Sequence, residues 1–183
     1  MTTLLVPIAD GSEDIETVTI IDVLRRGGVE VVVASVHDRK MIKAARGSNV
    51  EADVLLTDVA DTMFDAIALP GGMPGAEHLR DSSVLIDMLE KHDIHDALLA
   101  AICAAPALVL GTHGFLVDKQ ATCYPGFETG LTGADYVSDQ PIVMDGNILT
   151  SQGPATAMTF ALGLLANLKG YDVAQEVADQ LLC

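Results

Sequence analysis

The chain has 183 residues, half of them hydrophobic and a fifth charged, which is the composition of a folded domain and not of a disordered segment. Aspartate and glutamate outnumber lysine and arginine by 26 to 10, and a net charge of −16 repels nucleic-acid phosphates and anionic membrane surfaces. We therefore expect one domain over residues 1–183, no nucleic-acid partner and no membrane association.

The three cysteines, Cys103, Cys123 and Cys183, are an odd number without CxxC spacing. This pattern fits neither a disulfide framework nor a zinc site, so we expect free thiols, a reducing compartment and no metal site. The N-terminus lacks a basic segment followed by a long apolar run, and no uninterrupted apolar stretch reaches the length of a membrane span. These features predict a cytoplasmic protein.

The first part of the chain alternates apolar runs with helical patterns. Residues 4–9 are a short apolar run, residues 13–26 have helical spacing that ends at two glycines, and residues 29–36 are rich in β-branched side chains. This order is a βαβ unit, which implies parallel strands. Residues 39–50 mix charges, glycine and short alternating stretches, and this predicts a small hairpin that protrudes from the sheet.

The same alternation continues to the end of the chain. It predicts strands at 66–69 and 97–102, a strand pair at 141–144 and 148–150 around a turn at Asp145 and Gly146, and helices at 83–92, 104–110, 156–168 and 173–182. The whole pattern predicts an α/β fold, with a doubly wound, mostly parallel sheet and helices on both faces. Ligands of such sheets bind beyond the carboxyl ends of the strands.

Cys103 lies at one of these ends, because it follows the strand at 97–102 directly and is followed by Ala104, Ala105 and Pro106. This is a tight elbow from strand to helix. Free N–H groups at the start of a helix favour a thiolate and would lower the thiol pKa from about 8.5. The alternative is that Cys103 serves only as a small buried apolar residue.

Glu16 is the second candidate, because Ile20 and Val23 lie four and seven residues further along the same helical stripe. A carboxyl group on an apolar stripe is partly desolvated, which raises its pKa, and a protonated Glu16 would donate a hydrogen bond to a thiolate and move protons. The alternative is an exposed acid that the helix dipole favours, as Glu13 is expected to be.

Gly71 and Gly72 follow the strand at 66–69 and would let backbone amides approach a ligand, forming an oxyanion hole together with the amide of Ala104. A simple tight turn explains these glycines equally well. The spacing matches no nucleotide-binding motif, so we expect no cofactor. None of the five histidines follows Cys103, and we expect most of them at the surface.

Five segments together resemble the ThiJ/PfpI superfamily, and specifically its DJ-one branch, from end to end of the chain. They are residues 11–17 (GSEDIET), 22–28 (DVLRRGG), 69–72 (LPGG), 100–106 (AAICAAP) and 149–154 (LTSQGP). The resemblance implies a flavodoxin-like fold, a homodimer, and a reactive Cys103 hydrogen-bonded to Glu16.

The resemblance also implies a function. Members of the branch are described as cofactor-free glyoxalases or deglycases, whose substrates are small carbonyl compounds or glycated proteins, and as oxidative-stress proteins with chaperone behaviour. Oxidation of the elbow cysteine to a sulfinate is a further trait of the family.

The resemblance adds Glu13, Arg46, Tyr124 and Pro154 as candidates for the substrate pocket. Arg46 matches an arginine that approaches the site across the dimer in relatives. Tyr124, which precedes Pro125, stands where some relatives carry a histidine. A phenol moves protons less readily than an imidazole at neutral pH, so carbonyl chemistry would then depend more on Glu16.

These observations give one leading hypothesis and two others. The leading hypothesis is a cysteine-dependent, cofactor-independent enzyme that acts on 2-oxoaldehydes or their glycation adducts. The alternative is a redox-sensing stress protein or chaperone that uses the oxidation of Cys103, with little turnover. A peptidase, the activity of another branch, is the third, and the absence of a histidine after Cys103 counts against it.

Overall fold

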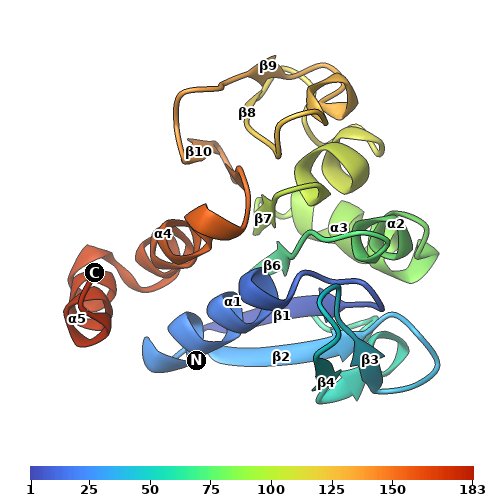
Figure 1. Ribbon diagram of the computed structural model, residues 1–183, viewed down its shortest axis with the longest axis horizontal. Helices are drawn as coiled ribbons and strands as arrows, with labels where there is room; N and C mark the ends of the chain where they lie inside the picture. Colours follow the sequence, from blue (N-terminus) through green and yellow to red (C-terminus); the bar gives the residue numbers. More distant parts are fainter.

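The computed structural model describes residues 1–183 and confirms an α/β fold on a seven-stranded sheet (Figure 1). In spatial order the strands are β10 (Ile142–Asp145), β11 (Ile148–Ser151), β7 (Leu98–Ile102), β6 (Ala66–Leu69), β1 (Thr3–Ile8), β2 (Glu30–Ser35) and β5 (Val54–Leu55). All neighbours pair in parallel except β10, which runs antiparallel to β11 at one edge.

Both faces of the sheet are buried, because alternate residues of each strand point to opposite sides. In β1, Leu4 and Val6 belong to the core on one face, while Leu5 belongs to the core on the other. The first face is covered by α1 (Asp14–Arg26) and α4 (Ala157–Lys169), with α5 (Tyr171–Leu181) packed against α4. The second is covered by α2 (Gly75–Arg80), α3 (Ser83–Ile94) and η2 (Pro106–Gly111).

The protruding hairpin is confirmed. Strands β3 (Met41–Lys43) and β4 (Asn49–Glu51) form a two-stranded antiparallel sheet that lies beyond the end of β2 in Figure 1. A second small sheet, which the sequence did not indicate, pairs β8 (Gln120–Ala121) with β9 (Asp135–Tyr136). Short 3-10 helices occupy Leu56–Val59, Glu128–Gly130 and Pro154–Thr156.

Three local predictions need correction. The helix expected at 104–110 is the π-helix η2, which begins at Pro106, where the missing N–H of proline costs nothing. The turn between β10 and β11 lies one residue later than expected, because Asp145 still pairs with Ile148 and Gly146 takes a φ of +60°. The helix α2 was missed, since six residues are too few to show a helical period.

The carboxyl ends of three neighbouring strands meet at one edge of the sheet. The chain leaves β1 toward β2, then returns to the other side of β1 to form β6 and β7. Such a reversal leaves a crevice where ligands bind in open α/β sheets. The segment after β1, the turn after β6 and Cys103 after β7 therefore share one location. No helix combines the length and the apolar character needed to cross a bilayer.

Candidate active site

The backbone at Cys103 is strained in the way that an elbow requires. Its φ is +66°, a conformation that costs a residue with a side chain about 1–2 kcal/mol. Hydrogen bonds hold it in place, because its N–H donates to the carbonyl of Ser151 (3.0 Å) and its carbonyl accepts the N–H of Tyr124 (2.8 Å). The side chain is 8% exposed, so the thiol is largely buried but reachable.

Glu16 lies in the first turn of α1 and is fully buried. The helix begins after Glu13, whose Oε2 accepts the N–H of Glu16 (3.0 Å). The Oε2 of Glu16 accepts the N–H of Gly71 (2.8 Å). Its Oε1 is buried and accepts no hydrogen bond, and the Cys103 thiol adjoins the carboxyl group. The exposed acid that we considered as an alternative for Glu16 is therefore wrong.

The glycine pair explains how the thiol and the acid come so close. A Cβ at Gly71 would lie 2.6 Å from the Cβ of Cys103 and 2.9 Å from the Oε2 of Glu16, so no larger residue fits there. Gly72 has a φ of +88°, and its amide and that of Ala104 lie close enough to the Cys103 sulfur to act against the rise of the thiol pKa. Two amides thus adjoin the reacting atom.

Burial and the charge of one group on the other determine the pKa values of Glu16 and Cys103. Burial raises the pKa of Glu16 from its ordinary value of 4.5 to about 7, against the opposing effect of the Gly71 amide. Burial and then the negative charge of Glu16 raise the pKa of Cys103 to about 12, while the amides of Gly72 and Ala104 act in the opposite direction. The lowered thiol pKa that we expected from the helix start is therefore wrong, because burial and the charge of Glu16 outweigh the effect of the amides on the thiol pKa.

A cavity of about 420 Å³ opens onto Cys103. It is lined by Glu13, Ala45, Arg46, Gly72, Met73, Cys103, Ala104, Tyr124, Phe127 and Pro154. All four residues that the resemblance added lie on its wall. Glu16 and Gly71 do not line the cavity. They lie behind Cys103, which does. The structure thus brings the candidate residues together, and their chemical roles remain predictions.

The hairpin carries one wall of the cavity. The N–H of Arg46 donates to Asp14 Oδ2 (2.7 Å), and the N–H of Ala45 donates to the carbonyl of Ser12 (2.9 Å). These bonds tie the hairpin loop to the segment before α1. Arg46 therefore lines the cavity of its own chain, whereas the resemblance implies an approach across a dimer.

Sequence reasoning missed Ala45, Met73 and Phe127. Met73 could have been found, because it directly follows the glycine turn. Phe127 lies three residues after Tyr124, and the two rings meet edge to face with centroids 6.4 Å apart. Nothing in the sequence marks Ala45, which reaches the cavity only because the hairpin folds back over α1.

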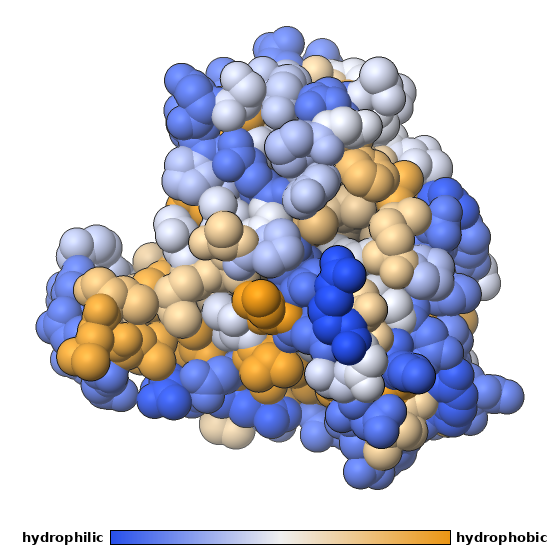
Figure 2. Space-filling view, viewed as in Figure 1, coloured by the Kyte–Doolittle hydropathy of each residue, from blue (hydrophilic) through white to orange (hydrophobic).

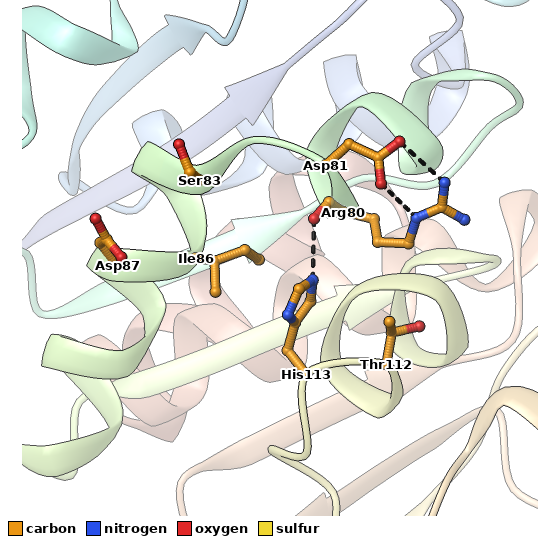
Figure 3. Close-up of a pocket in the computed structure, with 7 residues that line it drawn as sticks. All are labelled: Arg80, Asp81, Ser83, Ile86, Asp87, Thr112 and His113. Atoms are coloured by element: carbon orange, nitrogen blue, oxygen red, sulfur yellow. Dashed lines mark hydrogen bonds and ion pairs between the residues drawn. The ribbon is translucent and has the colours of Figure 1, made fainter.

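A hollow of similar size, about 440 Å³, contains none of these residues (Figure 3). The guanidinium of Arg80 is paired with the carboxylate of Asp81 (2.7 Å), and Nε2 of His113 lies 2.9 Å from the carbonyl of Arg80. Arg80 and Asp81 therefore neutralise one another, and no cysteine lines this hollow. Nowhere in the chain do three or more His, Cys, Asp or Glu side chains gather in a way that could hold a metal ion.

Comparison with known proteins identifies the family. The model of the DJ-1/PfpI family matches residues 2–167. The chain belongs to the DJ-1/PfpI family. Its structure superposes on oxidised DJ-1 of Toxoplasma gondii with a TM-score of 0.96 and 46% identity, covering 100% of this chain and 98% of the other.

Curated relatives place the chain in the DJ-1 branch of this family. DJ-1 homolog B of Arabidopsis thaliana is 45% identical over 179 residues, which are 98% of this chain and 41% of the plant protein. The chain therefore spans less than half the length of that relative. A Caenorhabditis elegans protein named glutathione-independent glyoxalase DJR-1.2 is 36% identical over 169 residues, covering 91% of this chain and 88% of the worm protein.

Proposed function

We propose that the chain is a glutathione-independent glyoxalase or deglycase, which converts 2-oxoaldehydes or their glycation adducts with Cys103 as nucleophile. One observation carries the proposal: a thiol in a cavity is contacted by two backbone amides and by a buried carboxyl group whose pKa lies at about 7. A group with that pKa both gives and takes protons at neutral pH. The name of the worm relative supports the same reaction class.

In the first step the Cys103 thiol passes its proton to the Glu16 carboxylate, and the sulfur forms a bond to the aldehyde carbon of the substrate. The electron pair of the carbonyl moves to oxygen, where the amides of Gly72 and Ala104 stabilise the negative charge. The acid form of Glu16 then donates its proton to that oxygen. The product of this step is a hemithioacetal, and Glu16 is left as a carboxylate.

The second step moves two protons along the substrate. The Glu16 carboxylate removes the proton from the carbon bound to sulfur, the hydroxyl proton passes to the former ketone oxygen, and Glu16 returns its proton to the former ketone carbon. This yields a thioester of a 2-hydroxy acid, with no change in the overall oxidation state. Water then cleaves the thioester, so one 2-oxoaldehyde and one water give one 2-hydroxy acid and the free thiol.

The test is the formation of lactate from methylglyoxal by purified protein without glutathione, measured by an enzymatic lactate assay. We expect Cys103→Ala to abolish the activity and Cys183→Ser, at the exposed terminal thiol, to retain it. Equal lactate formation by wild type and Cys103→Ala would disprove the proposal. Recovery of the unmodified lysine side chain in a glycated peptide tests the deglycase reaction in the same way.

The redox-sensor alternative rests on the same cysteine. Cys103 is 8% exposed at the cavity, and the amides that would stabilise an oxyanion would also stabilise the oxygens of a sulfinate. Protein treated with hydrogen peroxide would then gain two oxygen atoms at Cys103, as measured by mass spectrometry, in a preparation that forms no lactate. A peptidase fits less well, because no histidine lines the cavity.

We also propose a homodimer, with a second copy of the chain on the outer face of α1. Ile15 and Val18 lie three residues apart on this helix and are 56% and 55% exposed. Figure 2 shows apolar side chains gathered over α1, α4 and α5. Exposed apolar patches of this kind are typical of interaction surfaces.

The three free thiols and the acidic surface are consistent with action in the cytoplasm.

A further inference from the structure

Two hollows of the surface meet at the Tyr124 side chain. The cavity at Cys103 and a neighbouring hollow of about 170 Å³ share Tyr124 and Pro154 as lining residues. The smaller hollow is otherwise lined by Pro125, Gln152, Gly153, Ala155 and Thr156. The rings of Tyr124 and Pro154 therefore form the boundary between the nucleophile and a second, mostly uncharged compartment.

The position of the Tyr124 ring is set by three contacts. Its backbone N–H donates to the carbonyl of Cys103, which ties the residue to the nucleophile (2.8 Å). Its ring packs on the edge of Phe127, which also lines the Cys103 cavity. On the other side, a Cβ at Gly153 would lie only 3.0 Å from Cδ2 of the ring. The ring is thus held between the two hollows.

We propose that Tyr124 is a specificity-determining residue, whose ring binds a flat apolar substituent on the ketone side of a 2-oxoaldehyde. The inference rests on the proposed function and adds the substrate class. A three-carbon substrate such as methylglyoxal fills little of the two hollows, whereas sites of this size enclose much larger ligands. Aromatic and proline rings bind flat apolar groups well. The aldehyde group of an aryl-substituted 2-oxoaldehyde would lie at Cys103, while its aromatic ring would lie at the boundary formed by Tyr124 and Pro154.

The ring and the hydroxyl group of Tyr124 make different predictions. Tyr124→Phe keeps the ring and removes the hydroxyl group, so it would spare the preference for an aryl substrate. Gly153→Ala keeps the whole of Tyr124 but forces its ring to move, and the extended backbone at Gly153 accepts alanine. If the hydroxyl group transferred protons instead, Tyr124→Phe would be the damaging change and Gly153→Ala would have little effect.

The experiment compares kcat/KM for phenylglyoxal and methylglyoxal. In wild type we expect phenylglyoxal to be preferred by about tenfold, the range that apolar pockets achieve. Tyr124→Ala should lower this ratio by about fivefold or more and Gly153→Ala should lower it by a smaller factor, while Tyr124→Phe keeps it. Tyr171→Ala, at an exposed tyrosine on α5, is the matched control and should leave the ratio unchanged. A ratio that Tyr124→Ala does not lower would overturn the inference.

A binding measurement separates this inference from the proposed function. Acetophenone carries an aryl ketone but no aldehyde, and its binding to Cys103→Ala protein can be followed by ligand-observed NMR. We expect saturation transfer to acetophenone in the Cys103→Ala protein, and a loss of most of it when Tyr124→Ala is added. If neither aldehyde is turned over, the proposed function fails, while this measurement still decides the role of Tyr124. Equal transfer in both proteins would refute that role.

Discussion

The carboxyl group of Glu16 accepts the Gly71 amide on one oxygen, at 2.8 Å, and its other oxygen is buried without a hydrogen bond. A buried acceptor without a partner is costly, and most costly when it carries charge. Protonation removes the charge and creates a donor beside the Cys103 thiol. The bond to Gly71 therefore fixes the carboxyl group where one proton can be exchanged between acid and thiol.

The first prediction concerns the pH dependence of Cys103 alkylation. Because acid and thiol interact strongly, they lose their protons as a pair. We expect the rate of alkylation by iodoacetamide to rise through about pH 7, the pKa of Glu16, and then to level off well before the pKa of about 12 at Cys103. In the plateau the pair holds one proton, and in a constant fraction of the molecules this proton is on Glu16, so that Cys103 is a thiolate.

Glu16→Gln should remove the rise near pH 7, because an amide cannot take up the proton. Both proteins would carry Cys183→Ser, since Cys183 is exposed and would react as well. A single rise at the ordinary thiol pKa of about 8.5 in both proteins would contradict the shared proton.

The second prediction concerns stability. The folded-state pKa of Glu16 is raised from 4.5 to about 7, so its contribution is fully present below pH 4.5 and is lost as the pH rises through 7. The loss amounts to about 3 kcal/mol at 1.36 kcal/mol per pKa unit. Between pH 4.5 and 8 the free energy of unfolding of Glu16→Gln should therefore rise relative to wild type by about this amount.

Urea denaturation at several pH values measures this difference. Glu176→Gln, which removes an exposed carboxylate from α5, is the control and should show no such change. A constant difference between Glu16→Gln and wild type across this range would mean that Glu16 titrates normally in the folded protein.

The third prediction tests the fit at Gly71. A Cβ there would lie 2.6 Å from the Cβ of Cys103, so Gly71→Ala should destabilise the protein by about 1–3 kcal/mol and displace the nucleophile. Gly163→Ala in α4 is the matched control, because its Cβ would meet only the flexible end of Ile142 at 3.1 Å. We expect lactate formation to fall only in Gly71→Ala. Thermal unfolding gives the stabilities, and equal effects of the two variants would argue against the tight fit.

The fourth prediction concerns acid sensitivity. His92 is the one buried histidine of the five and is 1% exposed; its Nε2 accepts the N–H of Phe64 (3.0 Å), and burial lowers its pKa. A lowered folded-state pKa contributes stability above the ordinary value of 6.5, and this stability is lost as the pH falls below it. Below pH 6.5 the free energy of unfolding of the wild type should therefore decline relative to that of His92→Leu. The same relative decline measured against the exposed-site variant His95→Gln, and its absence against His92→Leu, would contradict this role of His92.

The fifth prediction concerns the proposed homodimer. Val18→Asp places a charge on the exposed apolar face of α1 and should convert the dimer to a monomer, as measured by light scattering after size exclusion. Val117→Asp, which changes an equally exposed valine remote from α1 in the chain, should leave the dimer intact. A monomeric wild type would refute the homodimer outright.

The sequence by itself determined the fold class and the order of the longer strands and helices, but not β5, α2 or the β8–β9 pair. Apolar runs of four to eight residues alternate with amphipathic segments, and this alternation specifies a parallel sheet covered on both faces. It also placed Cys103 at an elbow, because no loop residues separate β7 from the following turn. Local patterns of this kind depend only on neighbours in the chain.

The tertiary structure decided the chemistry of the pair. Whether Glu16 is buried or exposed depends on the turn after β6, which is 55 residues away and supplies the Gly71 amide. The thiol pKa depends first on burial and then on the charge of Glu16, as well as on the amides at the helix start, so the sequence indicated the wrong direction for it. The second hollow beyond Tyr124 arises from packing against residues 152–156. Burial and long-range proximity are properties of the folded chain, and no local pattern contains them.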